Sequence, residues 1–169
     1  HIIAKKRFST TGALWRFFAR FNDRVIGSSK WVVRSLQEMG IPAAKLRRIY
    51  YGIDLKSVRT FKSVPLAQAR KAGVPVKGPV VGVVAMHRTH KGIDLFLEAC
   101  LRVVKVHKTA QFVIIGDPQK AEEAMEPSIQ RLAAEPSLKG RVHLLPGQRN
   151  VPAWMLRFDF LVSTSRWEV

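Results

Sequence analysis

The 169-residue sequence has little cysteine, few acidic side chains and no long apolar run. Its one cysteine, Cys100, excludes an internal disulfide and is compatible with a reducing compartment. No apolar run approaches the roughly 20 residues that a membrane-spanning helix needs. The sequence also lacks G-x-G-x-x-G and G-x-x-x-x-G-K-S/T, which excludes the dinucleotide fingerprint and the phosphate-binding loop of nucleotide hydrolases. Because it begins with His1 instead of Met, we expect it to be a fragment.

The scarcity of acidic side chains makes the chain strongly basic, with 29 Lys and Arg against 12 Asp and Glu and a net charge of +17. The charge is uneven. Residues 1–77 hold 17 basic and 3 acidic side chains, whereas residues 78–169 hold 12 and 9. This imbalance predicts an anionic partner, which is a nucleic acid, an anionic membrane face or a phosphorylated substrate.

Apolar runs alternate with helical patterns along the chain, which predicts an α/β fold with parallel, Rossmann-like sheets. The strands are expected at residues 23–29, 46–51, 80–85, 110–115, 142–145 and 158–163. The helices are expected at residues 31–39, 66–72, 93–107, 122–134 and 152–157. Residues 61–78 are basic and contain Pro and Gly, so we expect a linker there between a domain of residues 1–60 and one of residues 79–169.

An earlier segment, residues 13–21, reads ALWRFFARF and places its large apolar side chains on one helical face. Arg16 and Arg20 lie on the other face. Such a basic amphipathic helix fits an anionic membrane surface, and it equally fits packing on its own domain with the arginines in solvent. Both interpretations stay open at this point.

Residues 79–99 combine a buried strand, a basic turn and a helix. The turn at residues 86–92 contains Arg88 and Lys91, and the helix begins at Gly92 or Ile93. In open α/β sheets, ligands bind at the carboxyl ends of the strands, where such a turn lies. The helix start adds N–H groups and partial positive charge, so the turn predicts a phosphate clamp. The alternative is a solvated loop that happens to be basic.

Several segments, in their order and spacing, resemble the retaining GT-B glycosyltransferases of the group 1, or family four, type. The resembling segments are DRVIGSSKWVVRSLQEMGIPAAKLRRIYYGID, HRTHKGIDLFLEA, FVIIGD and RVHLLPGQRNVPAWMLRFDFLVSTSRWE. The resemblance implies the end of an N-terminal domain followed by the first part of a C-terminal, donor-binding domain. It implies transfer of a sugar from a UDP- or GDP-linked donor to a cell-envelope or lipid-linked acceptor, such as a lipopolysaccharide precursor, with retention of configuration. It also implies that the chemistry needs no metal.

The resemblance implies roles for three residues near the reacting atoms. Arg88 and Lys91 coincide with the family's Arg and Lys that hold the diphosphate, and Glu168 coincides with the first of two glutamates near the donor sugar and the ribose. Thr164 and Val169 depart from the family pattern, which has Pro and Gly there. The family's acceptor loop and second glutamate are not in this sequence, so we expect the chain alone to be inactive.

The same resemblance implies a donor-binding role for the loop at residues 147–151. The nucleobase packs there in the family, so Gly147, Gln148 and Arg149 are expected to contribute, with Asp117 at the end of the preceding Gly-Asp strand. Trp154 is expected in the core.

Two competing interpretations concern metals and nucleic acids. His87 and His90 have no third ligand at a suitable spacing, so we predict no metal site. The alternative function is a non-catalytic basic module that binds nucleotides or nucleic acid. We disfavour nucleic acid because no known module is recognisable and the aromatic residues do not alternate with the basic ones. We expect the protein in the cytoplasm, peripheral on the inner face of the membrane.

Overall fold

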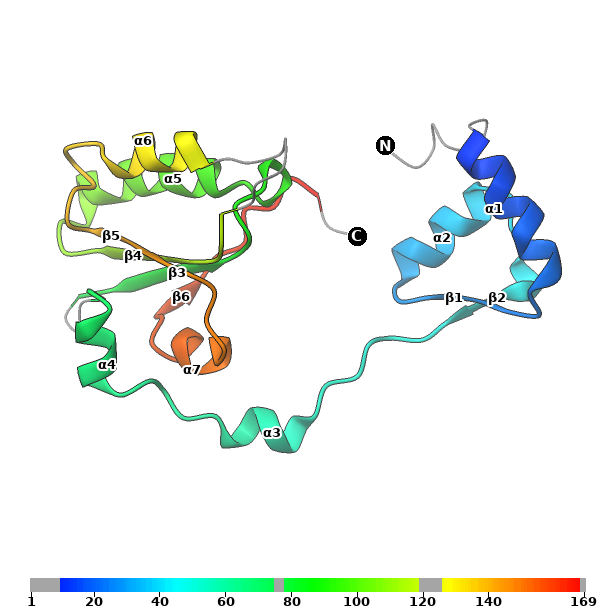
Figure 1. The fold of residues 1–169 in the computed structure, drawn as a ribbon, viewed down its shortest axis with the longest axis horizontal. Helices are drawn as coiled ribbons and strands as arrows, with labels where there is room; N and C mark the ends of the chain where they lie inside the picture. Colours follow the sequence, from blue (N-terminus) through cyan, green and yellow to red (C-terminus); the bar gives the residue numbers. More distant parts are fainter. Residues whose placement is uncertain (1–9, 75–77, 119–125, 168–169) are drawn as a thin grey trace. The chain divides into compact units, whose positions relative to one another are not determined.

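The computed structural model describes residues 10–74, 78–118 and 126–167 (Figure 1). The chain divides into two compact units between Asp54 and Leu55, and each unit is described by itself. Every strand pair in the described residues is parallel, so the predicted α/β class with parallel sheets is confirmed.

Unit 1 contains a two-stranded sheet and two helices. In chain order its elements are α1 (Thr10–Phe21), β1 (Val25–Gly27), α2 (Lys30–Glu38), the 3-10 helix η2 (Ala43–Lys45) and β2 (Leu46–Arg48). Ser29 caps α2, because its side chain accepts a hydrogen bond of 3.1 Å from the amide of Val32. Gly40 follows the helix with a φ of 92°, a left-handed conformation that glycine adopts without strain.

The apolar face of α1 is not covered by the described part of unit 1. Ala19 of α1 is buried together with Ile41 and Leu46. The large apolar side chains of α1 are instead more than half exposed: Leu14, Trp15, Phe17, Phe18 and Phe21. The helix therefore packs on its unit through a small residue and leaves its aromatic side chains accessible.

Unit 2 is built on a four-stranded parallel sheet with the order β5-β4-β3-β6. Its elements are α3 (Leu55–Thr60), α4 (Leu66–Lys71), β3 (Val80–Val84), the 3-10 helix η3 (Thr89–Lys91), α5 (Ile93–Val106), β4 (Gln111–Ile115), α6 (Glu126–Ala133), β5 (Val142–Leu145), α7 (Val151–Met155) and β6 (Phe160–Leu161). The strand bounds 142–145 agree with the prediction, and β3 and β4 differ from it by one residue.

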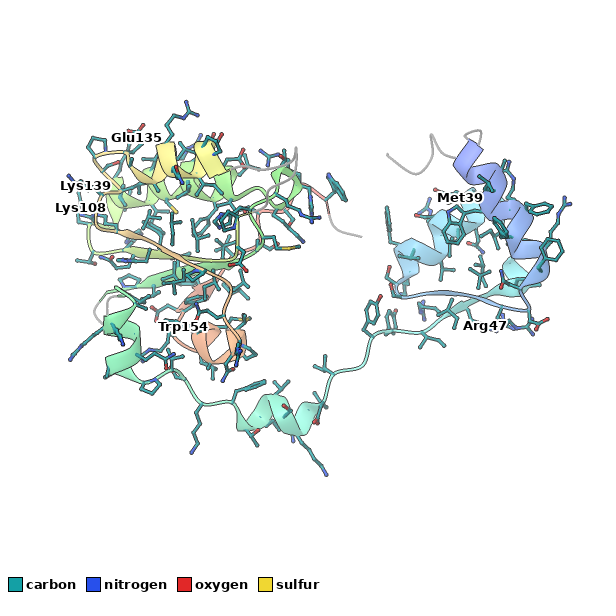
Figure 2. The ribbon with its side chains drawn as sticks, in the orientation of Figure 1. Met39, Arg47, Lys108, Glu135, Lys139 and Trp154 are labelled. Carbon is teal, nitrogen blue, oxygen red and sulfur yellow. The ribbon has the colours of Figure 1, made fainter. Side chains whose placement is uncertain are left out.

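Helices cover both faces of this sheet (Figure 1). On one face, Phe112 and Ile114 of β4 are buried in a cluster with residues of α5 and α6. On the other face, Val113 and Ile115 are buried with residues of the α4 region and with Trp154 of α7, which lies within the unit (Figure 2). Burial on both faces explains why β3 and β4 are continuously apolar in the sequence. The prediction that Trp154 is a core residue is confirmed, since it is 3% exposed.

The segment predicted as a linker, residues 61–78, is partly structured in unit 2. Its described part contains α4, and it buries Val64, Ala69 and Val74 against the sheet. The short helix α3 was not predicted. The division into an acceptor-side domain, a linker and a donor-binding domain stays a prediction.

The last strand is shorter than predicted. The apolar pattern predicts a strand over residues 158–163, but in the described residues β6 pairs with β3 at two positions, Val81↔Phe160 and Gly82↔Leu161. Phe158 precedes the ladder and packs over Gly82, where any Cβ would collide with its ring. Phe158 is apolar because its ring packs against β3, and it takes no part in the strand pairing. The apolar pattern therefore predicts a longer strand than the structure has.

Candidate functional site

The carboxyl edge of the four-stranded sheet gathers every predicted site residue that the structure describes. β3 leads through α5 to β4 on one side, whereas β6 lies on the other side of β3. The strand order therefore reverses at β3. In open α/β sheets, ligands bind outside the carboxyl ends of the strands at such a reversal. A ligand site is therefore expected in the space beyond the carboxyl ends of β3 and β6.

A hollow of about 260 Å³ lies at this place. Its walls are the end of β3, the end of β6 and the residues that follow β6, and they include Lys91, Met155, Ser163, Thr164 and Ser165. Lys91 is the one charged side chain among its lining residues. Arg88 lies three residues earlier in the same loop and is half-buried, but it is not among the residues that line this hollow.

The loop between β3 and α5 has a defined backbone. His87 is 3% exposed and donates its amide to the carbonyl of Asp117 over 3.1 Å, which joins the loop after β3 to the loop after β4. Thr89–Lys91 form a 3-10 turn, and Gly92 then adopts a left-handed φ of 63°. A Cβ on Gly92 would collide with the carbonyl oxygen of Thr164, so glycine is required there by both conformation and space.

Gly92 is the N-cap of α5 and has no side chain to accept from the N–H groups of the first turn. These N–H groups and the helix dipole give the start of a 14-residue helix a partial positive charge. The fold therefore contains the predicted combination: Arg88 and Lys91 lie in the loop that leads directly into the start of α5. This arrangement favours a bound anion over a neutral ligand.

A second loop, which follows β6, is fastened to this segment. The guanidinium of Arg166 forms an ion pair with Asp94 in the first turn of α5, with N–O distances of 2.5 and 3.0 Å. The amide of Arg166 donates to the carbonyl of His90 over 2.7 Å. The ring of Trp167 stacks on that of His90, with centroids 4.5 Å apart. These contacts could not be predicted from the sequence, because the partners are more than 70 positions apart and no local pattern relates them.

The Asp94 carboxylate is electrostatically unusual. Burial alone would raise its pKa, but the hydrogen bond from Arg166 and those from backbone amides outweigh burial and hold the pKa below its ordinary value. The hydrogen bond to Asp94 raises the pKa of Arg166 in turn. Both groups therefore stay charged at neutral pH, and Arg166 compensates a negative charge that lies beside the start of α5.

The loops after β4 and β5 meet at Asp117 and Gly147. The side chain of Asp117 accepts a hydrogen bond of 2.7 Å from the amide of Gly147. Gln148 accepts from the indole of Trp154 over 3.1 Å, which connects this loop to α7. Gly147, Gln148 and Arg149 line a separate hollow of about 640 Å³, together with residues 62–65, Gln68 and the start of α7. Sequence reasoning did not place residues 62–68 beside this loop.

The predicted site residues thus fall into two groups along one sheet edge. Arg88 and Lys91 lie after β3, and Lys91 lines the smaller hollow. Asp117, Gly147, Gln148 and Arg149 lie after β4 and β5, and the last three line the larger one. Glu168 lies outside the described residues, so its predicted role is not tested.

Other chemistry is limited in the part of the chain that the structure describes. No group of three or more His, Cys, Asp or Glu in that part is placed to hold a metal ion. Burial raises the pKa of the Cys100 thiol to about 12, so the thiolate that a nucleophile requires is not formed at neutral pH. No helix formed by the described residues has both the length and the apolar character needed to cross a membrane.

A basic hollow also exists at the opposite, amino edge of the sheet. It measures about 670 Å³ and is lined by Gly78, Lys108, Thr109, Gln111, Lys139, Gly140 and Arg141. Arg141 donates to the carbonyl of Lys108. No acidic side chain is among its lining residues. This edge contrasts with the carboxyl edge, because the residues that line its hollow carry three positive charges and none of them begins a helix.

Comparison with known proteins gives a family and a fold. Residues 78–169 match the family model described as Glycosyl transferases group 1. No curated protein sequence matches the chain.

Among solved structures, Alr3699/HepE of Anabaena in complex with UDP and glucose is similar, with a TM-score of 0.79 at 22% identity over 98% of this chain and 44% of its own. Sucrose-phosphate synthase of Thermosynechococcus elongatus has a TM-score of 0.69 at 18% identity over 98% of this chain and 43% of its own. The lipopolysaccharide outer core galactosyltransferase WaaB has a TM-score of 0.60 at 18% identity over 88% and 38%. The chain therefore spans less than half of these proteins' length.

Proposed function

The chain belongs to the glycosyl transferases group 1 family, and on that premise we propose that its unit 2 binds the nucleoside diphosphate of a nucleotide-sugar donor. The observation that carries the proposal is the hollow at the ends of β3 and β6, which contains Lys91 and adjoins the start of α5. This position is where the topology of an open α/β sheet favours a ligand, and its charge favours a phosphate.

The proposed chemistry is transfer of a sugar by a GT-B glycosyltransferase. The bond between the anomeric carbon and the diphosphate oxygen breaks, and the electron pair leaves with the diphosphate. The oxygen of an acceptor hydroxyl bonds to the same carbon, and its proton passes to the departing diphosphate. Negative charge therefore increases on the leaving group in the transition state. Arg88, Lys91 and the N–H groups at the start of α5 supply positive charge where this negative charge develops. Arg88 offers a planar fork of donors and Lys91 a point charge, so the two side chains are not interchangeable.

The base is proposed to lie at the neighbouring loops, in contact with Gly147, Gln148 and Arg149. The hydrogen bond between Asp117 and Gly147 fixes the loops after β4 and β5 relative to one another. We propose a UDP- or GDP-linked donor, and the similarity in fold to a protein solved with UDP and glucose supports testing UDP first. Glu168 is proposed to lie near the donor sugar.

Retention of configuration and a lipid-linked or cell-envelope acceptor complete the proposal for the whole enzyme. The similarity in fold to a lipopolysaccharide galactosyltransferase supports such an acceptor. The exposed aromatic side chains of α1, together with the exposed Arg20 and Arg24, support contact with an anionic membrane on the cytoplasmic side. Co-sedimentation with vesicles containing an anionic lipid tests this part, and it should decrease as salt is raised.

Calorimetric titration of the chain with UDP, GDP and ADP tests the donor proposal. We expect saturable binding of one nucleotide and a loss of about tenfold or more in affinity for Arg88→Ala and for Lys91→Ala. Lys105→Ala is the matched control, because Lys105 is exposed in the last turn of the same helix whose start follows the basic loop. The Lys105→Ala variant loses one positive charge, as Lys91→Ala does, but it should bind the nucleotide with the affinity of the unaltered chain.

The alternative, a non-catalytic basic module, predicts another result in the same titration. If charge alone drives binding, all three nucleotides bind weakly and equally, DNA or RNA binds more tightly, and Lys105→Ala weakens binding as much as Lys91→Ala. This pattern would contradict a donor site at the ends of β3 and β6.

A further inference from the structure

We propose that Arg166 and Asp94 form a clasp that positions the basic loop of residues 88–92 for a nucleoside diphosphate. The clasp is the ion pair between these two side chains together with the hydrogen bonds that join the loop after β6 to residues 89–91. In this role Arg166 and Asp94 are positioning residues. The inference rests on the proposed function, because the loop that they hold is the proposed diphosphate site.

Three hydrogen bonds from the loop after β6 reach the loop before α5. Besides its two bonds to Asp94, the guanidinium of Arg166 donates to the carbonyl of Thr89 over 2.5 Å. The amide of Arg166 donates to the carbonyl of His90, and the hydroxyl of Thr164 donates to the carbonyl of Lys91 over 3.4 Å. Three successive carbonyls, those of residues 89, 90 and 91, are therefore bound from the other loop.

These bonds act on the backbone that carries Lys91. Two of the residues that they join, 91 and 164, both line the hollow of about 260 Å³. Ordering these lining residues before the ligand arrives lowers the entropy lost on binding, so a fixed loop binds a phosphate more tightly than a mobile one. A bidentate Arg–carboxylate pair is suited to this, because two parallel bonds define an orientation as well as a distance.

Charge gives the clasp a second consequence. Asp94 lies in the first turn of α5, where its carboxylate stabilises the helix but repels a phosphate at the same place. Arg166 neutralises that carboxylate through a pair whose side chains are only 34% and 21% exposed. Positioning and repulsion can be separated experimentally, because removing Asp94 abolishes both the clasp and the repulsion, whereas removing Arg166 abolishes the clasp and leaves the negative charge in place.

The test compares Asp94→Asn, Arg166→Gln and the double variant, which has the same net charge as the unaltered chain. Asp94→Glu is the conservative variant, since it keeps a carboxylate. The control is Arg34→Gln with Glu38→Gln, which removes the exposed ion pair of 3.1 Å on α2 and likewise preserves net charge. Each protein is titrated with UDP and with UMP, and amide hydrogen exchange is measured for residues 88–92 and 166.

We expect Asp94→Asn and the double variant each to weaken UDP binding about tenfold, because both remove the ion pair. Arg166→Gln should weaken UDP binding by more than this, because it also leaves the Asp94 carboxylate uncompensated beside the diphosphate. UMP should change by less than about twofold, since one phosphate uses the loop less. Asp94→Glu should recover part of the UDP affinity, and the control should change neither ligand. Exchange of the loop amides should become faster in the three clasp variants alone.

Three results would overturn the inference: UDP binding by the double variant equal to that of the unaltered chain, tighter UDP binding by Asp94→Asn, or equal weakening of UDP and UMP. The second result would show that repulsion outweighs positioning, and the third a general loss of structure. If the unaltered chain binds neither UDP nor UMP but binds another nucleoside diphosphate in the titration above, the same comparison is made with that nucleotide and its monophosphate. If it binds none, the proposed function itself fails, and the role of the clasp in binding fails with it.

Discussion

The two units use the same local pattern, strand followed by helix, but their buried apolar clusters differ in size in the described residues. The described residues of unit 2 form four parallel strands covered on both faces and two buried clusters of 11 and 9 residues. Those of unit 1 form two strands of three residues each and one cluster of three buried residues. The described sheet of unit 1 buries Ala19 of α1, and the aromatic side chains of α1 are more than half exposed. The candidate site lies in unit 2, at the carboxyl edge of the larger sheet.

The largest expected difference between the units comes from truncating the same residue type in each. Phe112 is 1% exposed in the sheet of unit 2, and Phe21 is 74% exposed in unit 1. Phe112→Ala should lower the free energy of unfolding of unit 2 by about 3–5 kcal/mol, whereas Phe21→Ala should change that of unit 1 by less than about 0.5 kcal/mol. Denaturant unfolding followed by residue-resolved hydrogen exchange measures both. Equal effects would mean that α1 is buried in solution.

Two lysines sharpen the comparison between binding and stability. The ammonium of Lys45 donates to the carbonyls of Ala19, Arg20 and Asn22 at the end of α1, at 2.9–3.0 Å. Lys45→Ala should destabilise unit 1 by about 1–2 kcal/mol and leave nucleotide affinity unchanged. Lys91→Ala should do the reverse, with little change in unfolding and a loss of affinity worth about 1.4 kcal/mol or more. Thermal unfolding and calorimetry of the same samples separate the two effects, and a loss of affinity in Lys45→Ala would contradict the assignment of binding to unit 2.

The helix cap of α2 provides a smaller test, confined to unit 1. Ser29 accepts from the amide of Val32, so Ser29→Ala should cost about 1 kcal/mol. Ser28→Ala is the control, because the neighbouring serine does not cap the helix. Hydrogen exchange of α2 amides should become faster in Ser29→Ala and stay unchanged in Ser28→Ala. An equal response of the two variants would show that the cap is not made in solution.

The smallest expected effect is a pH dependence of unit 2 from His143, which is half-buried and hydrogen-bonded to Gln111 at 3.0 Å. Burial lowers the pKa of His143 below its ordinary 6.5. The unfolded chain therefore binds a proton more readily than the folded one, so stability is complete above pH 6.5 and decreases as the pH falls below it. Unfolding between pH 7.5 and 5 measures the decrease, which should be smaller in His143→Gln. An unchanged pH dependence in that variant would assign the effect to other groups.

Much of unit 2 could be predicted because its signals are local. The continuous apolar runs of β3 and β4 reflect burial on both faces, and the helical spacing of Ile93 and Phe96 reflects the face of α5 that packs on the sheet. The basic loop could be predicted for the same reason, since Arg88 and Lys91 directly follow one of those strands. The resemblance to GT-B glycosyltransferases added the family and the fold to these local predictions, and the comparisons confirm both.

The parts that could not be predicted depend on contacts distant in sequence. The pairing of Arg166 with Asp94 joins residues 72 positions apart, and neither residue belongs to a pattern that identifies the other. The same is true of residues 61–78, which look like a linker because they are basic and contain Pro65, although Val64 and Ala69 are buried in unit 2. A sequence shows which side chains are apolar or charged, but only the fold shows which of them meet.

The most direct test of the central claim is amide chemical-shift mapping of the chain with UDP. The account predicts shifts at the carboxyl edge of the sheet of unit 2, at residues 85–92, 116–118, 146–150 and 163–165. It predicts none at Lys108, Lys139 and Arg141, which line the more highly charged hollow at the amino edge. Shifts centred on that amino edge, or spread over the basic residues of both units, would show that charge alone attracts the nucleotide and would contradict a donor site at the ends of β3 and β6.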